Sequence, residues 1–467
     1  MPAARASAAS NGDPVSATPA VVIAAPASGS GKTTVATGLI GALRRAGDRV
    51  APFKVGPDFI DPGYHALAAG RPGRNLDPVL VGTDLIGPLY RHGTRDADIA
   101  VVEGVMGLFD GRIEEPIRIP ASGSTGQVAQ LLGAPVVMVV DGRGQSQSIA
   151  AVLHGFSTLD HRVRVVGAIL NRVGSPRHEQ VLRQACETVG IPVLGSLPRF
   201  DELAVPSRHL GLVTAAEHGD RAHAAVAAMT DLIARHVDLG AVRALAASAV
   251  TDTPWSPGDA VGEPVIGRPV VAVAAGRAFT FGYAEGEELL QAAGAEVVAF
   301  DPLIEELPAG SAALVLPGGF PEQYPQELSA NEAVRAQIRA LATSGPVHAE
   351  CGGLTYLMSD LDGHPMCGVL AGSARFTQRL TLGYRDAVAA ADSALFTTGQ
   401  RVTGHEFHRT AVEFSDSVAP AWLMRGSGAD PVREGALRAG VHASYLHTHP
   451  AAQPAAVRRF VERACVH

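Results

Sequence analysis

Short, largely apolar runs recur along the first half of the chain and alternate with segments of helix length. Most of these runs are apolar at successive positions rather than at every second position, which is typical of strands covered on both faces. Such strands belong to parallel sheets whose connections are helices. The pattern predicts an α/β domain with a mainly parallel sheet, built from strands at 21–25, 49–55, 99–105, 135–141 and 163–173.

The same pattern fades near residue 236 and restarts at residue 268. The intervening stretch has no periodicity and is enriched in Pro, Gly and Ser, as linkers are. We therefore expect two α/β domains, 20–235 and 268–467, joined by a linker at 236–267. Each is expected to hold a mainly parallel sheet flanked by helices, and the strands of the second are predicted at 269–276, 295–300, 312–319, 345–350 and 441–447.

Composition agrees with two α/β domains and argues against several classes of binding partner. The 467 residues are 46% hydrophobic, which is enough for two cores. The formal net charge is -8, and the chain has no run of Lys or Arg, so we expect neither a nucleic acid nor a membrane as partner. No stretch reaches the roughly eighteen consecutive apolar residues of a membrane-spanning helix.

The cysteines and the first residues bear on the compartment. Cys186, Cys351, Cys367 and Cys465 show neither metal-ligand spacing nor the density of a disulfide scaffold, so we expect a reducing, cytoplasmic environment. Residues 1–19 are rich in Ala, Ser and Pro but lack the apolar core of a signal peptide. We expect them to form a disordered tail.

A glycine-rich segment follows the first predicted strand and begins a helix. Its end, "GKTT", is the end of a P-loop, in which backbone N–H groups hold phosphate, the lysine supplies charge and the first hydroxyl ligates Mg²⁺. Pro26 stands where the usual motif has its first glycine, so the loop is a variant. We expect ATP to be bound by Ser28, Gly29, Ser30, Gly31, Lys32, Thr33 and Thr34, with Asn171 at the end of a later strand contacting the adenine.

Carboxylates follow two other strands of the same predicted sheet. The carboxyl ends of parallel strands meet at one edge, so Asp58 and Glu103 are expected beside the P-loop, where they would hold Mg²⁺ together with Thr33. Lys54, Asp61 and His65 are candidates for holding an anionic substrate. For Asp58 and Asp61 the alternative is a role in capping turns, and for Lys54 and His65 it is simple solvation.

In the second half, "HAECGG" at 348–353 places a cysteine between a predicted strand and a glycine pair. A buried structural thiol is the default for such a residue. A sharp strand-to-helix turn, however, would expose Cys351 as a nucleophile. A second glycine pair at 318–319 could offer N–H groups to an oxyanion, and His447 ends a late strand, so the parts needed for acyl transfer through a thioester are present.

These motifs together carry a resemblance. The first half resembles P-loop enzymes of the dethiobiotin-synthetase type, and the second resembles class I glutamine amidotransferases of the triad family. In this order, "GPDFIDPGYH", "EGVMGLFDG", "LPGGFPEQYPQELSAN", "AECGGLTYL", "GHEFHR" and "ASYLHTH" resemble the cobyrinic or hydrogenobyrinic acid a,c-diamide synthases of corrinoid biosynthesis.

The resemblance implies roles for single residues. Cys351 would be the nucleophile, His447 its base, and Gly319 and Gly352 the oxyanion donors. Triads of this type place Glu two residues after the histidine, but His449 stands there, which leaves the third member open.

The resemblance also implies a reaction. It is the ATP- and glutamine-dependent amidation of two acetate carboxylates of a corrinoid through acyl phosphates, with Mg²⁺. The expected partners are the corrinoid polycarboxylate, L-glutamine and ATP, and a homodimer stays open. The alternatives are amidation of another tetrapyrrole, such as nickel sirohydrochlorin, and a regulatory P-loop ATPase.

Overall fold

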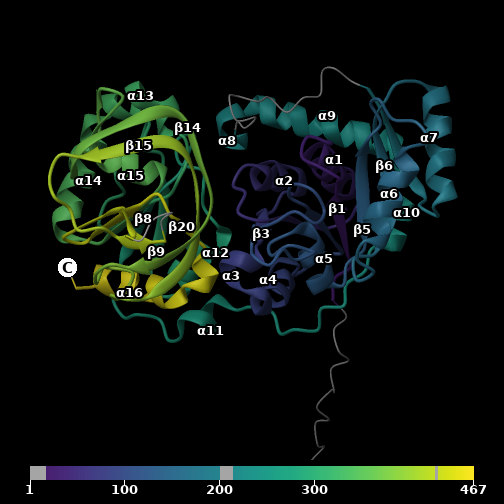
Figure 1. Cartoon of the computed structure of the whole chain (residues 1–467). Coiled ribbons are helices and arrows are strands. Elements are labelled where there is room, and N and C mark those ends of the chain that lie inside the picture. The colour runs from purple at the N-terminus through teal and green to yellow at the C-terminus, as the bar shows by residue number, and fades with distance from the viewer. Residues whose placement is uncertain (1–16, 200–213, 426–429, 467) are drawn as a thin grey trace, which may run out of the picture.

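The computed structural model describes residues 17–199, 214–425 and 430–466. These residues form two α/β bodies that lie side by side (Figure 1). Residues 1–16 of the predicted tail lie outside the described residues. Within the described segments, no helix combines the length and the apolar character needed to cross a membrane.

The first body is built on a seven-stranded sheet in which all strands are parallel, as the sequence predicts. Its spatial order is β3-β2-β4-β1-β5-β6-β7. The strands are β1 (Ala20–Ala24), β2 (Val50–Val55), β3 (Arg74–Leu76), β4 (Ile99–Glu103), β5 (Val136–Asp141), β6 (Val165–Val173) and β7 (Val193–Pro198).

Helices cover both faces of this sheet, and β1 shows why. Val21 and Ile23 pack with residues of α1 (Lys32–Arg45) and α9 (Asp220–His236), while Val22 and Ala24 pack with α5 (Thr125–Leu132) on the other face. All five residues of β1 are buried, so the strand is apolar on both sides. The remaining helices of this body are α2 (Asp61–Ala69), α3 (Pro78–Val81), η1 (Thr83–Leu85), α4 (Ile86–Gly93), α6 (Ile149–Thr158), α7 (Pro176–Thr188), α8 (Ala215–His218) and α10 (Leu239–Leu245).

The second body holds a six-stranded sheet in the order β18-β19-β11-β10-β8-β9, parallel except for β18. Its strands are β8 (Val270–Ala274), β9 (Glu296–Phe300), β10 (Ser311–Leu316), β11 (Val347–Glu350), β18 (Ala436–Arg438) and β19 (Val441–Ser444). The helices are α11 (Pro257–Val261), which precedes the sheet, then α12 (Ala284–Ala292), η2 (Pro321–Gln323), α13 (Pro325–Ala330), α14 (Glu332–Ser344), α15 (Gly352–Leu357), η3 (Pro450–Ala452) and α16 (Pro454–Ala464).

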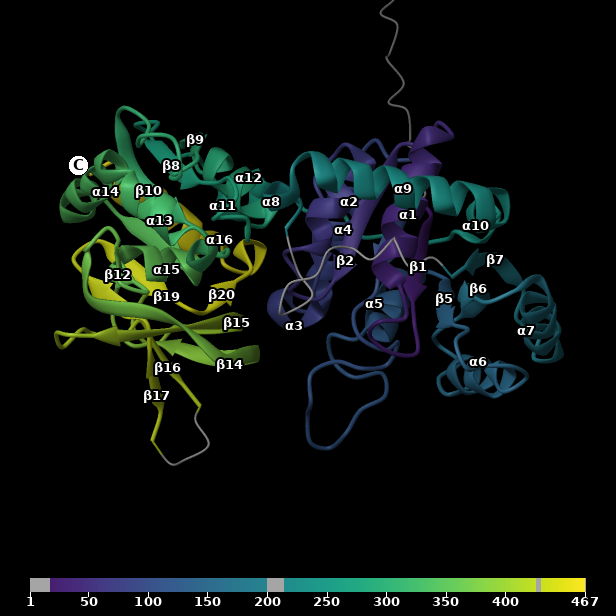
Figure 2. The same ribbon diagram turned by 90° about the horizontal axis from the view of Figure 1, so that it is seen from above.

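A further, mostly antiparallel sheet lies in the same body and was not predicted. Two long strands, β14 (Leu370–Ala389) and β15 (Arg401–Phe414), pair along most of their length (Figure 2). Burial along β14 does not alternate regularly, so its sequence lacks the period of two that would indicate a strand. The other strands are β12 (Met358–Leu361), β13 (His364–Pro365), β16 (Trp422–Met424), β17 (Val432–Glu434) and β20 (His447–Thr448).

The chain between the two parallel sheets stays close to the first one at its start. Val237 bridges to Gly195, and Ala247 bridges to Ala20 at the start of β1. The two bodies also meet directly, since the Arg74 guanidinium donates to Glu285 (2.6 Å) and to Glu288, both on α12. His92 Nε2 lies 2.9 Å from Glu288 Oε2.

Candidate active site

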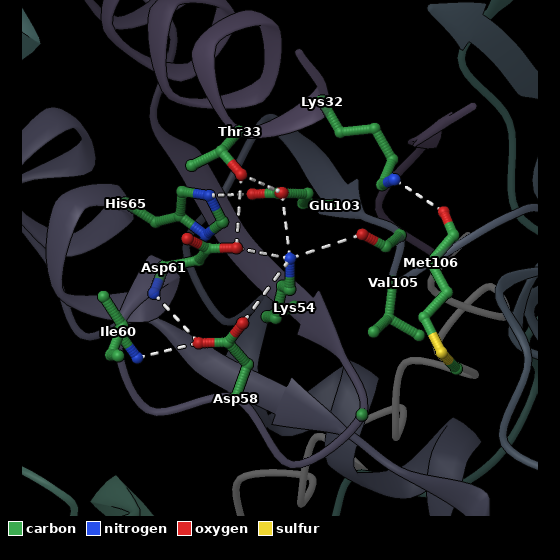
Figure 3. Close-up of polar contacts among 12 residues, drawn as sticks. Lys32, Thr33, Lys54, Asp58, Ile60, Asp61, His65, Glu103, Val105 and Met106 are labelled. Carbon is green, nitrogen blue, oxygen red and sulfur yellow. Dashed lines mark hydrogen bonds and ion pairs between the residues drawn. The ribbon is translucent and has the colours of Figure 1, made fainter. Parts of the chain in front are cut away.

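The P-loop joins β1 to α1, and its shape depends on glycine. Gly31 has φ 99°, and a Cβ there would lie 2.2 Å from Asn171 Nδ2, so both the conformation and the space exclude a larger residue. Lys32 begins α1, and its Nζ donates to Met106 O at 2.5 Å (Figure 3). The loop is therefore a preformed anion site at a helix N-terminus.

Burial and, after it, the nearby Lys54 lower the pKa of Lys32 to about 8, against the opposing effect of the carboxylates around it. The side chain is 8% exposed. Burial disfavours the charged form of this lysine, and an anion beside it favours that form. The Lys32 ammonium is therefore stabilised when a phosphate is bound next to it.

A second lysine lies at the centre of a carboxylate cluster next to the P-loop. Lys54 Nζ, from β2, lies 2.5 Å from Asp61 Oδ2 and 2.9 Å from Glu103 Oε1, and 3.8 Å from Asp58 Oδ2 (Figure 3). Lys54 is almost fully buried, which excludes the alternative of a solvated lysine. Burial acts to lower the pKa of Lys54, but Asp61 and Glu103 outweigh it and raise this pKa above its usual value.

Glu103 joins this cluster to the P-loop and to α2. Its Oε1 accepts from Thr33 Oγ1 at 2.7 Å, and its Oε2 lies 2.6 Å from His65 Nε2. Burial acts to raise the pKa of Glu103, but Lys54 and His65 offset it and hold this pKa below its usual value. His65 is completely buried, which again differs from solvation.

The two aspartates of the 58–61 turn behave differently. Asp58 Oδ1 accepts from the backbone N–H groups of Ile60 and Asp61, as a turn-capping residue does. Asp61 Oδ2 accepts from Thr33 Oγ1 at 3.2 Å, so Asp61 lies close to the hydroxyl expected to ligate Mg²⁺. Burial raises the pKa of Asp61 well above its usual value, and the nearby Asp58 adds to the effect.

The donors around Thr33 fit Mg²⁺ by their chemistry. They are hydroxyl and carboxylate oxygens, and Mg²⁺ is usually bound by one or two carboxylates together with phosphate oxygens and water. Among the described residues, no group of three or more His, Cys, Asp or Glu side chains forms a complete metal site. A metal held here would therefore need the phosphates to complete its shell.

Asn171 lies against the phosphate loop. Its Nδ2 donates to Ser30 O at 2.9 Å, and its Oδ1 accepts from the backbone N–H of Arg172. Both polar groups of the side chain therefore have partners in the protein, and the adenine contact stays a prediction.

Cys351 stands on a strained turn between β11 and α15. Its φ is 48° and its ψ is -103°, a conformation that is rare for a residue with a side chain. Its backbone N–H donates to Ser444 O at 2.7 Å, which fixes the turn to the end of β19. This is the strained strand-to-helix turn that presents a nucleophile in α/β enzymes.

Two backbone N–H groups face the sulfur of Cys351. Burial raises the pKa of the Cys351 thiol well above its usual value, and the nearby Glu322 adds to this, while the N–H groups of Gly352 and Gly319 act against it. A Cβ on Gly352 would lie 2.8 Å from Pro321 Cδ, and a Cβ on Gly319 would lie 2.1 Å from Ala278 O. The close approach of these two segments therefore requires glycine, and it aims both donors at one point.

His447, on β20, lies against the glycine pair at 318–319. A Cβ on Gly318 would lie 2.4 Å from His447 Cε1 and 3.2 Å from Nε2, so the ring lies against the glycine pair that contributes one N–H group. Both ring nitrogens of His447 are buried, and neither has a hydrogen-bond partner of good geometry among the described residues. The Cys351 thiol thus stands beside two backbone N–H groups, and the His447 ring lies against the glycine pair that carries one of them. The roles of oxyanion donors and of base stay predictions.

One residue of the first body touches the second site. Phe59, between Asp58 and Ile60, has its ring centroid 5.0 Å from that of His447 and 5.1 Å from that of Phe281. The turn that carries Asp58 and Asp61 therefore extends from the Lys54 cluster to the imidazole of the other body.

Comparison with known proteins agrees with this arrangement. Residues 21–213 match the CobQ/CobB/MinD/ParA nucleotide binding domain, and residues 270–455 match the CobB/CobQ-like glutamine amidotransferase domain. The hydrogenobyrinate a,c-diamide synthase of Mycobacterium tuberculosis (strain ATCC 25618 / H37Rv) is 69% identical over 95% of this chain and 98% of its own length. The chain belongs to the a,c-diamide synthase family.

Other members of this family are also similar over nearly the whole chain. The hydrogenobyrinate a,c-diamide synthase of Streptomyces coelicolor is 56% identical over 97% of this chain and 98% of its own length. The cobyrinate a,c-diamide synthase of Gloeobacter violaceus is 42% identical over 95% of this chain and 96% of its own length. The chain is thus a glutamine-dependent, amide-forming ligase with a nucleotide-binding domain.

Two features of the site were not predicted from the sequence. Phe59 was assigned no role, although an aromatic residue between Asp58 and Asp61 in a loop was a visible signal. Glu350 was also assigned none, although it directly precedes the proposed nucleophile; its Oε2 lies 3.4 Å from His447 Nδ1.

Proposed function

We propose that this chain amidates the a and c acetate carboxylates of hydrogenobyrinic acid, using ATP and L-glutamine. The observation that carries the proposal is the contact between the two sites through Phe59. The centroid of its ring lies 5.0 Å from that of the His447 ring. A phosphoryl-transfer site and a thioester site that share a turn are suited to a reaction in which one site makes ammonia and the other consumes it.

The first site deals with a poor leaving group. A carboxylate cannot accept ammonia directly, because oxide would have to leave. Transfer of the γ-phosphate of ATP to the carboxylate gives an acyl phosphate, whose phosphate leaves readily. In this proposal Lys32 follows the charge on the phosphoryl group, and the Lys54 ammonium, held by Asp61 and Glu103, faces the substrate carboxylate.

Mg²⁺ fits the oxygen donors of Thr33, Glu103 and the 58–61 turn, with Asp58 as the predicted ligand and Asp61 nearer to Thr33. When bound, it would neutralise charge on the phosphate oxygens. The turn is also held by Lys54, whose ammonium balances the same carboxylates.

The second site releases ammonia from glutamine. Cys351 attacks the side-chain amide, and His447 takes the thiol proton and gives it to the amide nitrogen, which leaves as ammonia. Water then cleaves the thioester and releases glutamate. The N–H groups of Gly319 and Gly352 stabilise the oxyanion of each tetrahedral intermediate.

In this proposal ammonia travels through a space between the two bodies. A cavity of about 520 Å³ lies between the bodies and is lined by Phe59, Gly63 and Ala66 from one side and by Phe279, Phe281 and Glu350 from the other. A mostly apolar lining admits neutral ammonia more readily than ammonium, whose transfer from water is costly. This favours delivery of the nucleophile in its reactive form.

A homodimer and a cytoplasmic location stay predictions. The four cysteines are all unbridged, and Cys186, Cys351 and Cys367 are buried, which is compatible with a reducing compartment.

A direct comparison of substrates tests the proposal. Purified protein is given ATP, Mg²⁺, L-glutamine and either hydrogenobyrinic or cobyrinic acid, and the products are identified by mass spectrometry. We expect a diamide from hydrogenobyrinic acid with a kcat/KM at least roughly tenfold higher than for cobyrinic acid.

Two outcomes would contradict the proposal. A preference for cobyrinic acid would reassign the substrate within the family. Amidation of nickel sirohydrochlorin alone, or ATP hydrolysis without any amide, would favour another tetrapyrrole ligase or a regulatory ATPase.

A further inference from the structure

The imidazole of a thiol–imidazole pair works best when its second nitrogen is held by an acceptor, which fixes the tautomer and the ring orientation. In this chain the residue two positions after His447 is His449, which cannot serve as a carboxylate. His449 Nδ1 accepts from the backbone N–H of Ala451, and its ring lies 4.2 Å from that of Tyr283. Burial lowers the pKa of His449 to about 4, so it is neutral at neutral pH and serves the turn at η3.

A carboxylate approaches His447 from the opposite direction. Glu350 Oε2 lies 3.4 Å from His447 Nδ1, the nitrogen remote from the glycine pair. The distance is longer than that of a strong hydrogen bond, and catalytic hydrogen bonds often tighten only when substrate is bound. The ring nitrogens of His447 are buried, so Glu350 is well placed to supply the missing acceptor.

The other oxygen of Glu350 holds the side chain in place. Oε1 accepts from the backbone N–H of Thr448 at 3.2 Å and lies 3.4 Å from His348 Nε2. The two carboxylate oxygens therefore have different partners. Oε1 is anchored to the backbone of Thr448, and Oε2 faces the imidazole of His447.

The strand geometry makes this placement a consequence of the sequence. Along β11, Val347 and Ala349 are buried, whereas His348 and Glu350 face the cavity between the bodies. Glu350 pairs with Ser444 at the end of β19, shortly before the chain reaches His447. The last residue of the strand thus lies next to His447, and the proposed nucleophile directly follows it in the chain.

Glu350 is charged in this environment. Burial acts to raise the pKa of Glu350, but His348 and His447 outweigh it and hold this pKa below its usual range. A buried carboxylate is costly unless it is paired, so its presence beside an imidazole calls for a reason.

We propose that Glu350 is the positioning carboxylate of the glutaminase site. Its Oε2 accepts the Nδ1–H of His447 and so keeps Nε2 unprotonated and directed to the thiol of Cys351. As the proton moves from sulfur to Nε2, the carboxylate stabilises the imidazolium that forms, and the thiolate attacks the amide. This inference rests on the thioester mechanism proposed above.

Glu350→Gln tests the assignment, because the amide keeps the size of the side chain but removes the charge and allows the wrong tautomer of His447. Glutamine-supported synthesis is compared with ammonium-supported synthesis, which uses only the first body. We expect kcat with glutamine to fall by about a hundredfold or more, with little change in the KM for glutamine. Ammonium-supported synthesis should stay within about twofold of that of the unchanged protein.

A second readout follows the thiol itself. Alkylation of Cys351 by iodoacetamide, measured by peptide mass spectrometry, should slow in Glu350→Gln because less thiolate forms without an oriented base. The matched control is Glu434→Gln. Glu434, like Glu350, is a partly buried glutamate near the turn at Cys351. It accepts from Ser444 Oγ at 2.6 Å and from the Tyr445 N–H at 2.7 Å, but these contacts are not to His447. It should leave the glutamine-to-ammonium ratio and the alkylation rate near those of the unchanged protein.

Each other outcome would overturn the inference. If Glu350→Gln keeps its glutamine-supported rate and its alkylation rate, the carboxylate does not position His447. If both nitrogen donors fail together, or if Glu434→Gln lowers the ratio equally, Glu350 serves only the fold. Cys351→Ala, measured alongside, separates the two proposals: its failure to abolish glutamine use would reject the thioester mechanism itself.

Discussion

At the scale of single residues, the site contains charged groups whose ionised form is disfavoured by burial and stabilised by neighbouring groups of opposite charge. Lys54 is surrounded by three carboxylates, while Lys32 has main-chain carbonyls as its hydrogen-bond partners. The pKa of Lys54 is accordingly raised and that of Lys32 is lowered to about 8 by burial. Of the two lysines, Lys32 is therefore the one whose charge depends on pH in the accessible range.

This difference predicts how nucleotide affinity changes with pH. Lys32 is charged below about pH 8 and neutral above it, and a phosphate favours the charged form. ATP affinity should therefore fall as pH rises, by about tenfold between pH 7 and pH 9, as measured by calorimetry at constant ionic strength.

Lys32→Arg is the control for this titration, because arginine stays charged throughout the range. Its affinity should be nearly constant between the two pH values, whatever its absolute level. If the ATP affinity of the unchanged protein does not vary with pH, the Lys32 ammonium does not balance the charge of the bound phosphate.

At the scale of elements, the sequence predicted the parts that depend on neighbours along the chain. The runs of buried residues at β1, β2, β4, β5 and β6 identify a parallel sheet, and "GSGKTT" identifies the turn that follows β1. The elbow at Cys351 was predictable for the same reason, because a strand, a cysteine and two glycines are contiguous. Local sequence specifies such turns through backbone conformation.

Contacts between distant segments could not be predicted in this way. Lys54 contacts Glu103, and Glu350 contacts His447, because parallel strands bring their carboxyl ends together. The order in which the strands pair cannot be read from any single segment of the sequence. The sheet of β14 and β15 was missed because its faces are partly exposed on both sides. Periodicity is informative when one face is buried and the other is not.

At the scale of the whole molecule, the two bodies are joined by paired charges and by aromatic packing. Arg74 is held by Glu285 and Glu288 across the interface, and Phe59 packs against Phe281, Tyr283 and His447. Phe59, in the 58–61 turn of the first body, thus lies next to the imidazole of His447 in the second body. It also lines the cavity through which ammonia is proposed to pass.

Removing this ring should impair the transfer of ammonia. Phe59→Ala enlarges the space between the bodies and admits water, which converts ammonia to ammonium. The glutamate released should then exceed the amide formed by roughly twofold or more, as measured by following both products in one reaction.

Phe156→Ala is the matched control. Phe156 lies on α6 of the first body and packs against Phe109 of the same body rather than at the interface. It should leave the two products in the ratio found for the unchanged protein. If Phe59→Ala releases glutamate and forms amide in equal amounts, the Phe59 ring does not prevent the loss of ammonia between the two sites.

The measurement that tests the account most directly is the ratio of glutamine-supported to ammonium-supported diamide synthesis in Cys351→Ala. The substitution removes the sulfur on the strained elbow and leaves the phosphate site, in the other body, unchanged. The account predicts that synthesis with glutamine falls at least about a thousandfold, while synthesis with high ammonium at mildly alkaline pH and saturating ATP is retained. An unchanged ratio, with both donors affected alike, would contradict it and return Cys351 to the role of a buried structural thiol.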